Sequence, residues 1–209
     1  MKIISALFGF VRLTRRMYNI DESHGLSHSM DVFIKADEIY RHEVSNYPYL
    51  KKQKHIIDAA AILHDTCDKK YMNSVEGLQR IRYFLQDKYS FDDIDIISNI
   101  ISQMSYSYVT KFGYPDLHNY QTAYHIVREA DLLSAYDIDR SIIYDMEVNN
   151  NGFIKSFENS DLLFENRMGK YISDELFITE YSKKLSIKLE SECIERMNAW
   201  KNAIDLTSL

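Results

Sequence analysis

The most constraining feature of this chain is an apolar run, residues 56–63, that ends in the adjacent pair His64-Asp65. The spacing of its apolar residues predicts a helix. Burying an imidazole and a carboxylate side by side at the end of such a helix is costly unless the two groups share a partner. A divalent metal ion suits both groups, so the pair predicts a metal site.

Two further residues are candidates for the same site. His28 falls on an earlier expected helix and Asp131 on a later one, so both can reach one point in a helical bundle. Two nitrogens and two oxygens form a mixed ligand set. Such a set suits one divalent ion of Mn, Ni, Co, Mg or Fe better than a closed structural zinc site, and it leaves positions open for water and substrate.

The order of these residues, H…HD…D, resembles the HD-domain superfamily of metal-dependent phosphohydrolases. Residues 21–28 (DESHGLSH) are similar to its first motif, and residues 60–70 (AAILHDTCDKK) to its HD motif. Residues 128–133 (READLL) are similar to the segment that supplies its last ligand. The resemblance covers residues 20–140. It implies that His28, His64, Asp65 and Asp131 hold the metal.

Composition and periodicity indicate an all-α fold. The chain has 209 residues, 45% of them hydrophobic, and only 2 prolines, which fits one compact helical bundle. The resemblance implies that this bundle is a single HD domain over residues 1–209. We expect nine or ten helices and no strand, with the helices within residues 155–206 packed on the same domain. Expected helices span residues 3–18, 24–44, 51–63, 74–87, 92–104, 121–135, 138–148 and 186–204, and a loop spans 111–119.

The residues beside the HD pair are candidates for catalysis and substrate binding. Asp68 lies where a carboxylate can transfer protons or orient the attacking water, although many members of the superfamily have a lysine there. Lys69 and Lys70 suit an anionic phosphate chain, with Lys70 favoured. His24, four residues before His28, is a candidate substrate-facing group. The alternative is that these four residues lie on the solvated surface and have no role in catalysis or binding.

Other polar residues are less informative. His118 and His125 are candidates for a second metal, but the interval 91–108 contains no histidine, so we expect one metal and assign both residues structural or solvent-facing roles. The residues that could line a pocket are Ser105, Tyr106 and Arg167. Their spacing in the sequence does not show whether they do so.

The resemblance implies an enzyme that hydrolyses a phosphoester or phosphoanhydride, with metal-activated water attacking phosphorus. The motif order looks most like that of the small stand-alone members of the superfamily, which act on nucleotides. Within that group, we expect a nucleoside triphosphate pyrophosphohydrolase or a nucleotide phosphatase. One alternative is a catalytically silent HD module that binds metal and nucleotide in a regulatory role. Another is a di-iron oxygenase, which needs additional histidines.

Charge and cysteine content limit the partners and the compartment. The net charge of −6 argues against nucleic acid as a partner. Cys67 and Cys193 form no disulfide framework or paired-cysteine motif, which fits a reducing interior. Residues 3–18 lack a cleavage site and are too short to span a bilayer, so we expect a packing helix, no membrane partner and a cytoplasmic protein. The sequence leaves the oligomeric state open.

Overall fold

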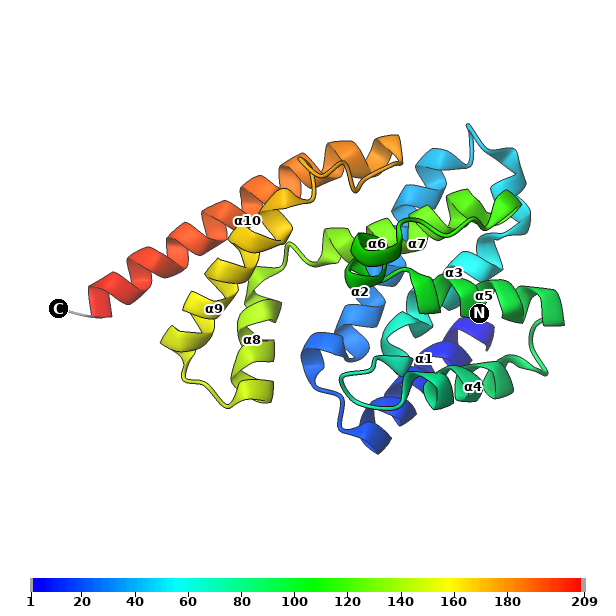
Figure 1. Cartoon of the computed structure of the whole chain (residues 1–209), viewed down its shortest axis with the longest axis horizontal. Helices are drawn as coiled ribbons and strands as arrows, with labels where there is room; N and C mark the ends of the chain where they lie inside the picture. The colour runs from blue at the N-terminus through cyan, green and yellow to red at the C-terminus, as the bar shows by residue number, and fades with distance from the viewer. Residues whose placement is uncertain (1, 208–209) are drawn as a thin grey trace.

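The computed structural model describes residues 2–207, which form ten α-helices and five short 3-10 turns and contain no β-strand (Figure 1). The expectation of an all-α fold is therefore confirmed. The helices are α1 (Lys2–Tyr18), α2 (Leu26–Glu43), α3 (Lys54–Leu63), α4 (Ser74–Leu85), α5 (Phe91–Gln103), α6 (Tyr106–Phe112), α7 (Gln121–Ser134), α8 (Ile138–Asn149), α9 (Phe153–Asn166) and α10 (Glu180–Thr207). The 3-10 turns are η1 (Glu22–His24), η2 (Pro48–Lys52), η3 (His64–Cys67), η4 (His118–Tyr120) and η5 (Met168–Lys170).

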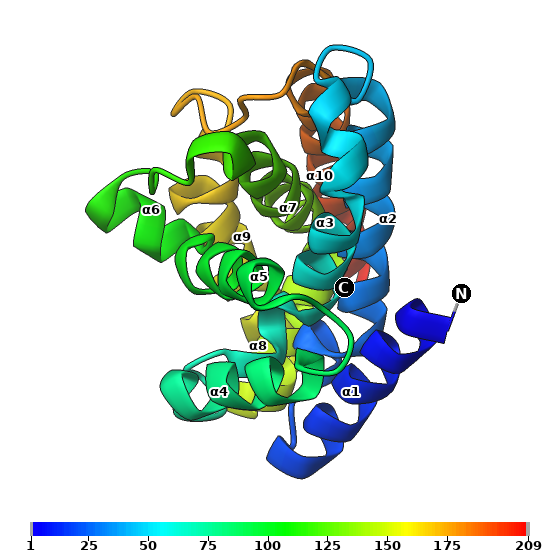
Figure 2. The same cartoon turned by 90° about the vertical axis from the view of Figure 1, so that its right-hand side faces the viewer.

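Helix α3 lies at the centre of the bundle. Seven of its ten residues are buried, and it packs against α1, α2, α5 and α7 (Figure 2). Three of the buried residues are the consecutive alanines Ala59, Ala60 and Ala61. Small side chains let neighbouring helices approach closely, so α2 and α7 also pack on each other beside α3. The junction of these three helices contains the candidate metal ligands.

A buried arginine and glutamate of α7 bind the segment that precedes the last helix. Arg128 and Glu129 of α7 are 2% and 0% exposed, and their side chains are 3.3 Å apart. Glu129 accepts hydrogen bonds from the backbone N–H groups of Ile178 at 2.8 Å and Thr179 at 3.2 Å. Arg128 donates to the carbonyl of Leu176. These bonds attach the segment before α10 to α7, and α10 then runs along α2, α7 and α8 (Figure 1).

Several boundaries differ from those expected from the sequence. The second helix begins at Leu26 rather than His24, because residues 22–24 form a 3-10 turn. The third begins at Lys54, since the chain after Pro48 forms the turn η2. Helix α6 was not predicted, and its last residues occupy the start of the expected loop 111–119. It spans only seven residues and none of them is buried, so its pattern is too short to indicate a helix.

Helix α1 is a packing helix, as its spacing predicted. Leu7, Val11 and Thr14 are buried, and the helix contacts α2 and α3. Across the described residues, no helix has both the length and the apolar character needed to cross a bilayer.

Close packing of α4 against η3 yields a first prediction. A Cβ atom on Gly77 would lie 2.6 Å from Cys67 Cβ and 2.9 Å from Cys67 Cα. We expect Gly77→Ala to lower the free energy of unfolding by roughly 1–3 kcal/mol, the usual cost of overpacking. Urea denaturation followed by circular dichroism measures this change.

Gly9 provides the matched control, because a Cβ there meets nothing within 4 Å. Gly9→Ala should raise the free energy of unfolding by about 0.5–1 kcal/mol, since alanine favours the helical state. A Gly77→Ala variant as stable as the parent would contradict the close packing of α4 on η3.

Candidate metal centre

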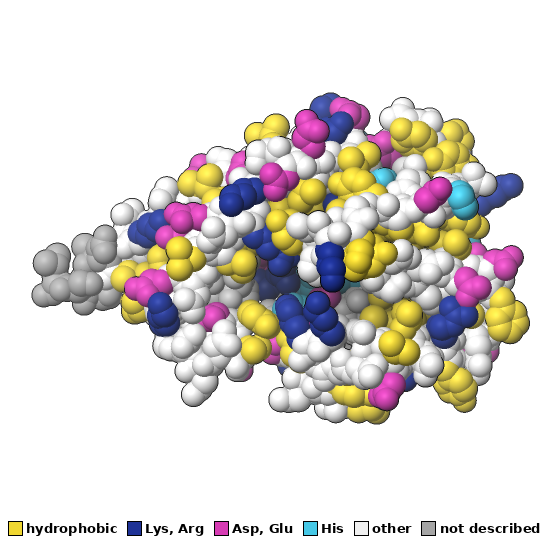
Figure 3. Space-filling model, viewed as in Figure 1, with side chains coloured by type: hydrophobic (Ala, Val, Ile, Leu, Met, Phe, Trp, Pro, Cys, Tyr) yellow, Lys and Arg dark blue, Asp and Glu magenta, His cyan; other side chains and the backbone are white. Residues whose placement is uncertain are grey.

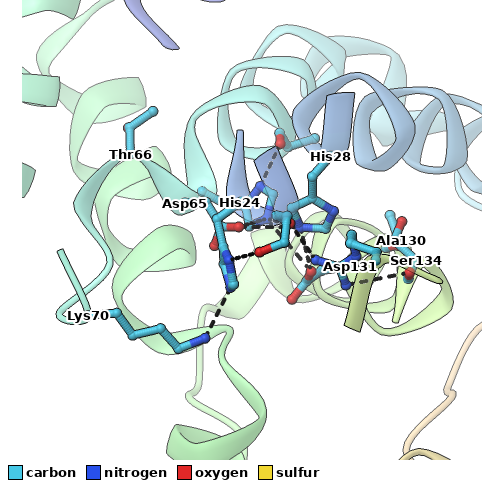
Figure 4. Close-up of polar contacts among 12 residues, drawn as sticks. His24, His28, Asp65, Thr66, Lys70, Ala130, Asp131 and Ser134 are labelled. Atoms are coloured by element: carbon cyan, nitrogen blue, oxygen red, sulfur yellow. Dashed lines mark hydrogen bonds and ion pairs between the residues drawn. The ribbon is translucent and has the colours of Figure 1, made fainter. Parts of the chain in front are cut away.

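Four side chains, from α2, α7 and the turn η3 that follows α3, converge where these elements meet. His28 Nε2 is 3.1 Å from His64 Nε2 and 3.3 Å from both Asp65 Oδ2 and Asp131 Oδ1. His64 Nε2 is 3.4 Å from the same Asp65 oxygen and 3.6 Å from the same Asp131 oxygen. Figure 4 shows His28, Asp65 and Asp131 turned toward one point. The structure thus brings together all four predicted ligands, which we call the His-Asp group.

The end of α3 fixes the orientation of His64. The last carbonyls of a helix lack partners within the helix. Here His64 Nδ1 donates to the carbonyl of Ala61 at 2.8 Å, and the Thr66 hydroxyl donates to that of Leu63 at 2.7 Å. Because a carbonyl only accepts, Nδ1 must hold the proton. When Nε2 loses its proton, as metal binding requires, the Nε2 lone pair is directed into the His-Asp group.

The spacing of the His-Asp group fits a divalent ion. Ligands about 2.1 Å from a metal lie about 3.0 Å apart in octahedral and about 3.4 Å apart in tetrahedral geometry. The five contacts described above span 3.1 to 3.6 Å. Asp65 Oδ2 is buried and has no hydrogen-bond partner among the described residues. The ligand atoms of His28, His64 and Asp65 all lie within 4.8 Å of one another, and Asp131 Oδ1 contacts both imidazoles.

The His-Asp group is open to solvent on its carboxylate side. The side chains of His28 and His64 are 2% exposed, whereas those of Asp65 and Asp131 are 17% and 29% exposed. Burial lowers the pKa of His64, but the carboxylates of Asp65 and Asp131 outweigh burial and raise it to about 9. The two acids thus favour positive charge here, which a proton supplies in the metal-free protein and a cation can supply instead.

A second hydrogen-bonded network holds His24 beside the His-Asp group. The hydroxyls of Ser23 and Tyr71 both donate to Asp21. Burial and the hydrogen bond to Asp21 raise the pKa of Tyr71 above its usual range, so its hydroxyl stays protonated. His24 Nδ1 lies 2.7 Å from Ser23 Oγ and 3.2 Å from Tyr71 Oη, and must donate to them. Its Nε2 is then free to accept from Lys70 Nζ at 3.0 Å.

The two predicted lysines differ in their surroundings. Both lysines are exposed. Lys70 Nζ contacts His24 (Figure 4) and lies 4.8 Å from the ring centroid of Tyr144, whereas Lys69 makes no such contact with the described residues. Lys70 is therefore the lysine that the structure places next to His24.

Asp68, predicted to transfer protons, is half-buried in the turn that follows η3. Its Oδ1 accepts from the backbone N–H of Lys70 at 2.8 Å. Within the described part of the chain, Asp68 makes no hydrogen bond or ion pair with the His-Asp group. The structure places it beside the group rather than in it.

The other two histidines considered as ligands lie apart from the His-Asp group. His118 is exposed, and its Nδ1 is 3.1 Å from Asp116. His125 is buried, and its Nε2 is 3.1 Å from the side-chain nitrogen of Gln121. Burial and the nearby Arg128 lower the pKa of His125 to about 4, so its imidazole is neutral.

Sequence reasoning missed the residues that support the site from a distance. Tyr144 of α8 covers both His24 and Lys70, and Arg140 donates to the carbonyl of Ser23 at 2.8 Å. These residues are more than 70 positions from the motifs they contact, and no local pattern marks them. Only the packing of α8 against η1 brings them together.

Comparison with known proteins gives no match, whether to a protein-family model, a curated protein or a solved structure.

Metal binding should stabilise the native state. Because the His-Asp group forms only on folding, a bound ion adds about 2.7 kcal/mol to the free energy of unfolding when present at 100 times its dissociation constant. We expect Mn²⁺ to raise the melting temperature of the parent protein. His64→Ala should abolish this rise, whereas His118→Ala should keep it because His118 is exposed and apart from the group. An equal rise in His64→Ala would exclude the His-Asp group as the binding site.

Proposed function

We propose that this protein is a metal-dependent phosphohydrolase that acts on nucleotides, with His28, His64, Asp65 and Asp131 as the ligands of one divalent ion. The observation that carries the proposal is the convergence of these four side chains at 3.1 to 3.6 Å. The order of the same residues along the chain resembles the HD-domain superfamily. The convergence in space and the order along the chain both support these four residues as ligands.

The surroundings of the His-Asp group suit a phosphate. When bound, the ion would neutralise phosphoryl oxygens and lower the pKa of a water molecule beside them. Lys70 adds a positive charge nearby. Only one of its three N–H donors is used by His24, which leaves two for an anionic oxygen. The partly exposed carboxylates keep the group accessible to a substrate from solvent.

Asp68 is our candidate for proton transfer. Its hydrogen bond from the Lys70 N–H fixes the carboxylate in the turn directly after the ligand-bearing segment, and Oδ2 remains available. In the proposed reaction, Asp68 takes a proton as the water oxygen bonds to phosphorus. It returns that proton to the leaving oxygen as the original P–O bond breaks. Lys70, held in place by His24, binds the phosphate during this exchange.

A catalytically silent module that binds metal and nucleotide is the second candidate. The observation that favours it is the absence of any contact between Asp68 and the His-Asp group among the described residues. Such a module would bind metal and nucleotide with the same residues but would not hydrolyse the nucleotide.

The proposal is tested by hydrolysis assays on metal-stripped protein reloaded with Mn²⁺, Ni²⁺, Co²⁺ or Mg²⁺. Nucleoside mono-, di- and triphosphates and cyclic nucleotides serve as substrates, and released phosphate and pyrophosphate are measured separately. We expect metal-dependent turnover that His64→Ala abolishes. Pyrophosphate release would identify a pyrophosphohydrolase, and phosphate release a phosphatase. Firm metal and nucleotide binding without turnover would instead support the silent module.

Asp68 yields a separate prediction. Asp68→Asn should lower kcat by about 100-fold or more while the metal stays bound, because general acid–base catalysis contributes at least that factor. Steady-state kinetics and metal analysis of the same sample measure both effects.

Asp116→Asn is the matched control. Asp116 also accepts a hydrogen bond from a backbone N–H two residues later, that of His118 at 2.9 Å, but it is exposed and apart from the His-Asp group. Loss of metal in Asp68→Asn would make Asp68 a ligand. Unchanged turnover would exclude its role in proton transfer.

A further inference from the structure

The two histidines of the His-Asp group differ in how their second ring nitrogen is held. His64 Nδ1 donates to the carbonyl of Ala61 at 2.8 Å. His28 Nδ1 is buried and has no hydrogen-bond partner among the described residues. Because His28 Nε2 faces the other ligands, a metal bound there requires the imidazole proton on Nδ1. Metal binding therefore leaves His28 with a buried N–H donor that needs an acceptor.

A cavity of about 190 Å³ adjoins His28. Three aspartates and Arg140 share its wall with His28, whereas the other three members of the His-Asp group do not line it. The cavity therefore lies on a different side of the His28 ring from the ligand atoms. Arg140 Nε is a second buried N–H group without a partner among the described residues. Two buried donors thus belong to residues in one cavity wall.

The cavity is large and polar enough for ordered water. One water molecule takes up about 30 Å³ in the liquid, and a buried one needs two to four polar partners. His28 and Arg140 supply donors here, and the aspartates supply acceptors. Histidine and acidic side chains are also visible from outside, in a hollow between lysine and arginine side chains (Figure 3), so solvent water reaches groups of these kinds.

Two of the three aspartates in the cavity wall are held by contacts of their own. Both oxygens of Asp139 accept from Arg196, and Oδ1 also accepts from Trp200 Nε1 at 2.7 Å. Asp137 caps α8, since its Oδ1 accepts from the backbone N–H of Arg140. These contacts fix both carboxylates at the start of α8.

Asp31, the third aspartate, is on the same helix as His28. It lies three residues after His28 on α2, so the two side chains share one helical face with Cβ atoms about 5–6 Å apart. Lys35 pairs with Oδ1 of Asp31, and Oδ2 can accept a hydrogen bond from the cavity. The side chain is 43% exposed, so water reaches it.

We propose that Asp31 positions His28 for metal binding, by accepting a hydrogen bond from water in this cavity that in turn accepts the Nδ1 proton of His28. A histidine ligand held in this way keeps the correct tautomer and ring orientation and binds metal more tightly. The inference rests on the proposed function in taking His28 as a metal ligand. Asp31 is a positioning residue, because it acts through His28 without touching the metal.

The test is isothermal titration of metal-stripped protein with Mn²⁺, without nucleotide. Asp31→Ala should weaken Mn²⁺ binding by about 10-fold, the lower end of the range for residues that orient a metal ligand, because water carries the contact. Asp31→Asn keeps an acceptor oxygen but not the charge, so its affinity should fall between those of the parent and Asp31→Ala. Parent-like affinity in Asp31→Ala would overturn the inference.

Asp37→Ala is the matched control. Asp37 is also on α2 and also pairs with a basic residue four positions later, Arg41 at 2.7 Å, but it does not line the cavity. Its Mn²⁺ affinity should stay within about 3-fold of the parent. An equal loss in Asp37→Ala would assign the effect to ion pairs along α2 and refute the role of Asp31. Melting curves show whether each variant folds, and Asp31→Asn carries the test if Asp31→Ala does not.

A second readout follows the proton itself. In Zn²⁺-loaded protein, which is diamagnetic, the ring nitrogens and protons of histidines are observed by NMR, and the His28 signal is the one missing from His28→Gln. We expect His28 to be protonated at Nδ1 and this proton to exchange slowly with solvent in the parent. In Asp31→Ala it should exchange faster. Equal exchange rates in the two proteins would refute the proposed hydrogen bond.

These measurements use neither nucleotide nor turnover, so the inference and the proposed function fail separately. Weakened Mn²⁺ binding and faster exchange in Asp31→Ala, in a protein that hydrolyses nothing, would support the role of Asp31 and refute the hydrolase. An active parent whose Asp31→Ala variant matches it in both measurements would refute the role of Asp31 and leave the hydrolase standing.

Discussion

The structure depends on how the bundle accommodates two buried imidazoles and two acids at the junction of α2, α3 and α7. Four polar side chains at 3.1 to 3.6 Å would be costly in an apolar core unless their charges were compensated. In the metal-free protein, a raised His64 pKa gives partial compensation. A divalent ion would balance both carboxylates and would join three helices at one point. Metal binding and stability of the core should therefore be linked.

Around this junction, hydrogen bonds fix the orientation of each polar group. The carbonyls at the end of α3 orient His64, and the Asp21, Ser23 and Tyr71 network orients His24. For His64 the free nitrogen faces the other three ligands, and for His24 it faces Lys70, while the opposite side of each ring is held by neighbours. This pre-organisation is what a site for anionic substrates requires, because little order remains to be imposed on binding.

The sequence predicted the helices with strong apolar periodicity but missed elements that depend on tertiary contacts. Helix α6 buries none of its residues, and α10 begins at Glu180 rather than Ser186, next to a segment attached by buried Glu129. The four candidate ligands could be identified because their motifs are local and ordered. The surroundings of Arg167 could not be predicted, since they depend on Tyr106 and Tyr171 and on the path of the chain after α9.

The most direct test of the central claim is an anomalous difference map from crystals grown with Mn²⁺. We predict one strong peak within about 2.0–2.3 Å of His28 Nε2, His64 Nε2 and an oxygen of each of Asp65 and Asp131, the range for nitrogen and oxygen ligands of such ions. The same map should show no comparable peak at His118 or His125. No peak at the His-Asp group, in crystals where Mn²⁺ is present at millimolar concentration, would contradict the account.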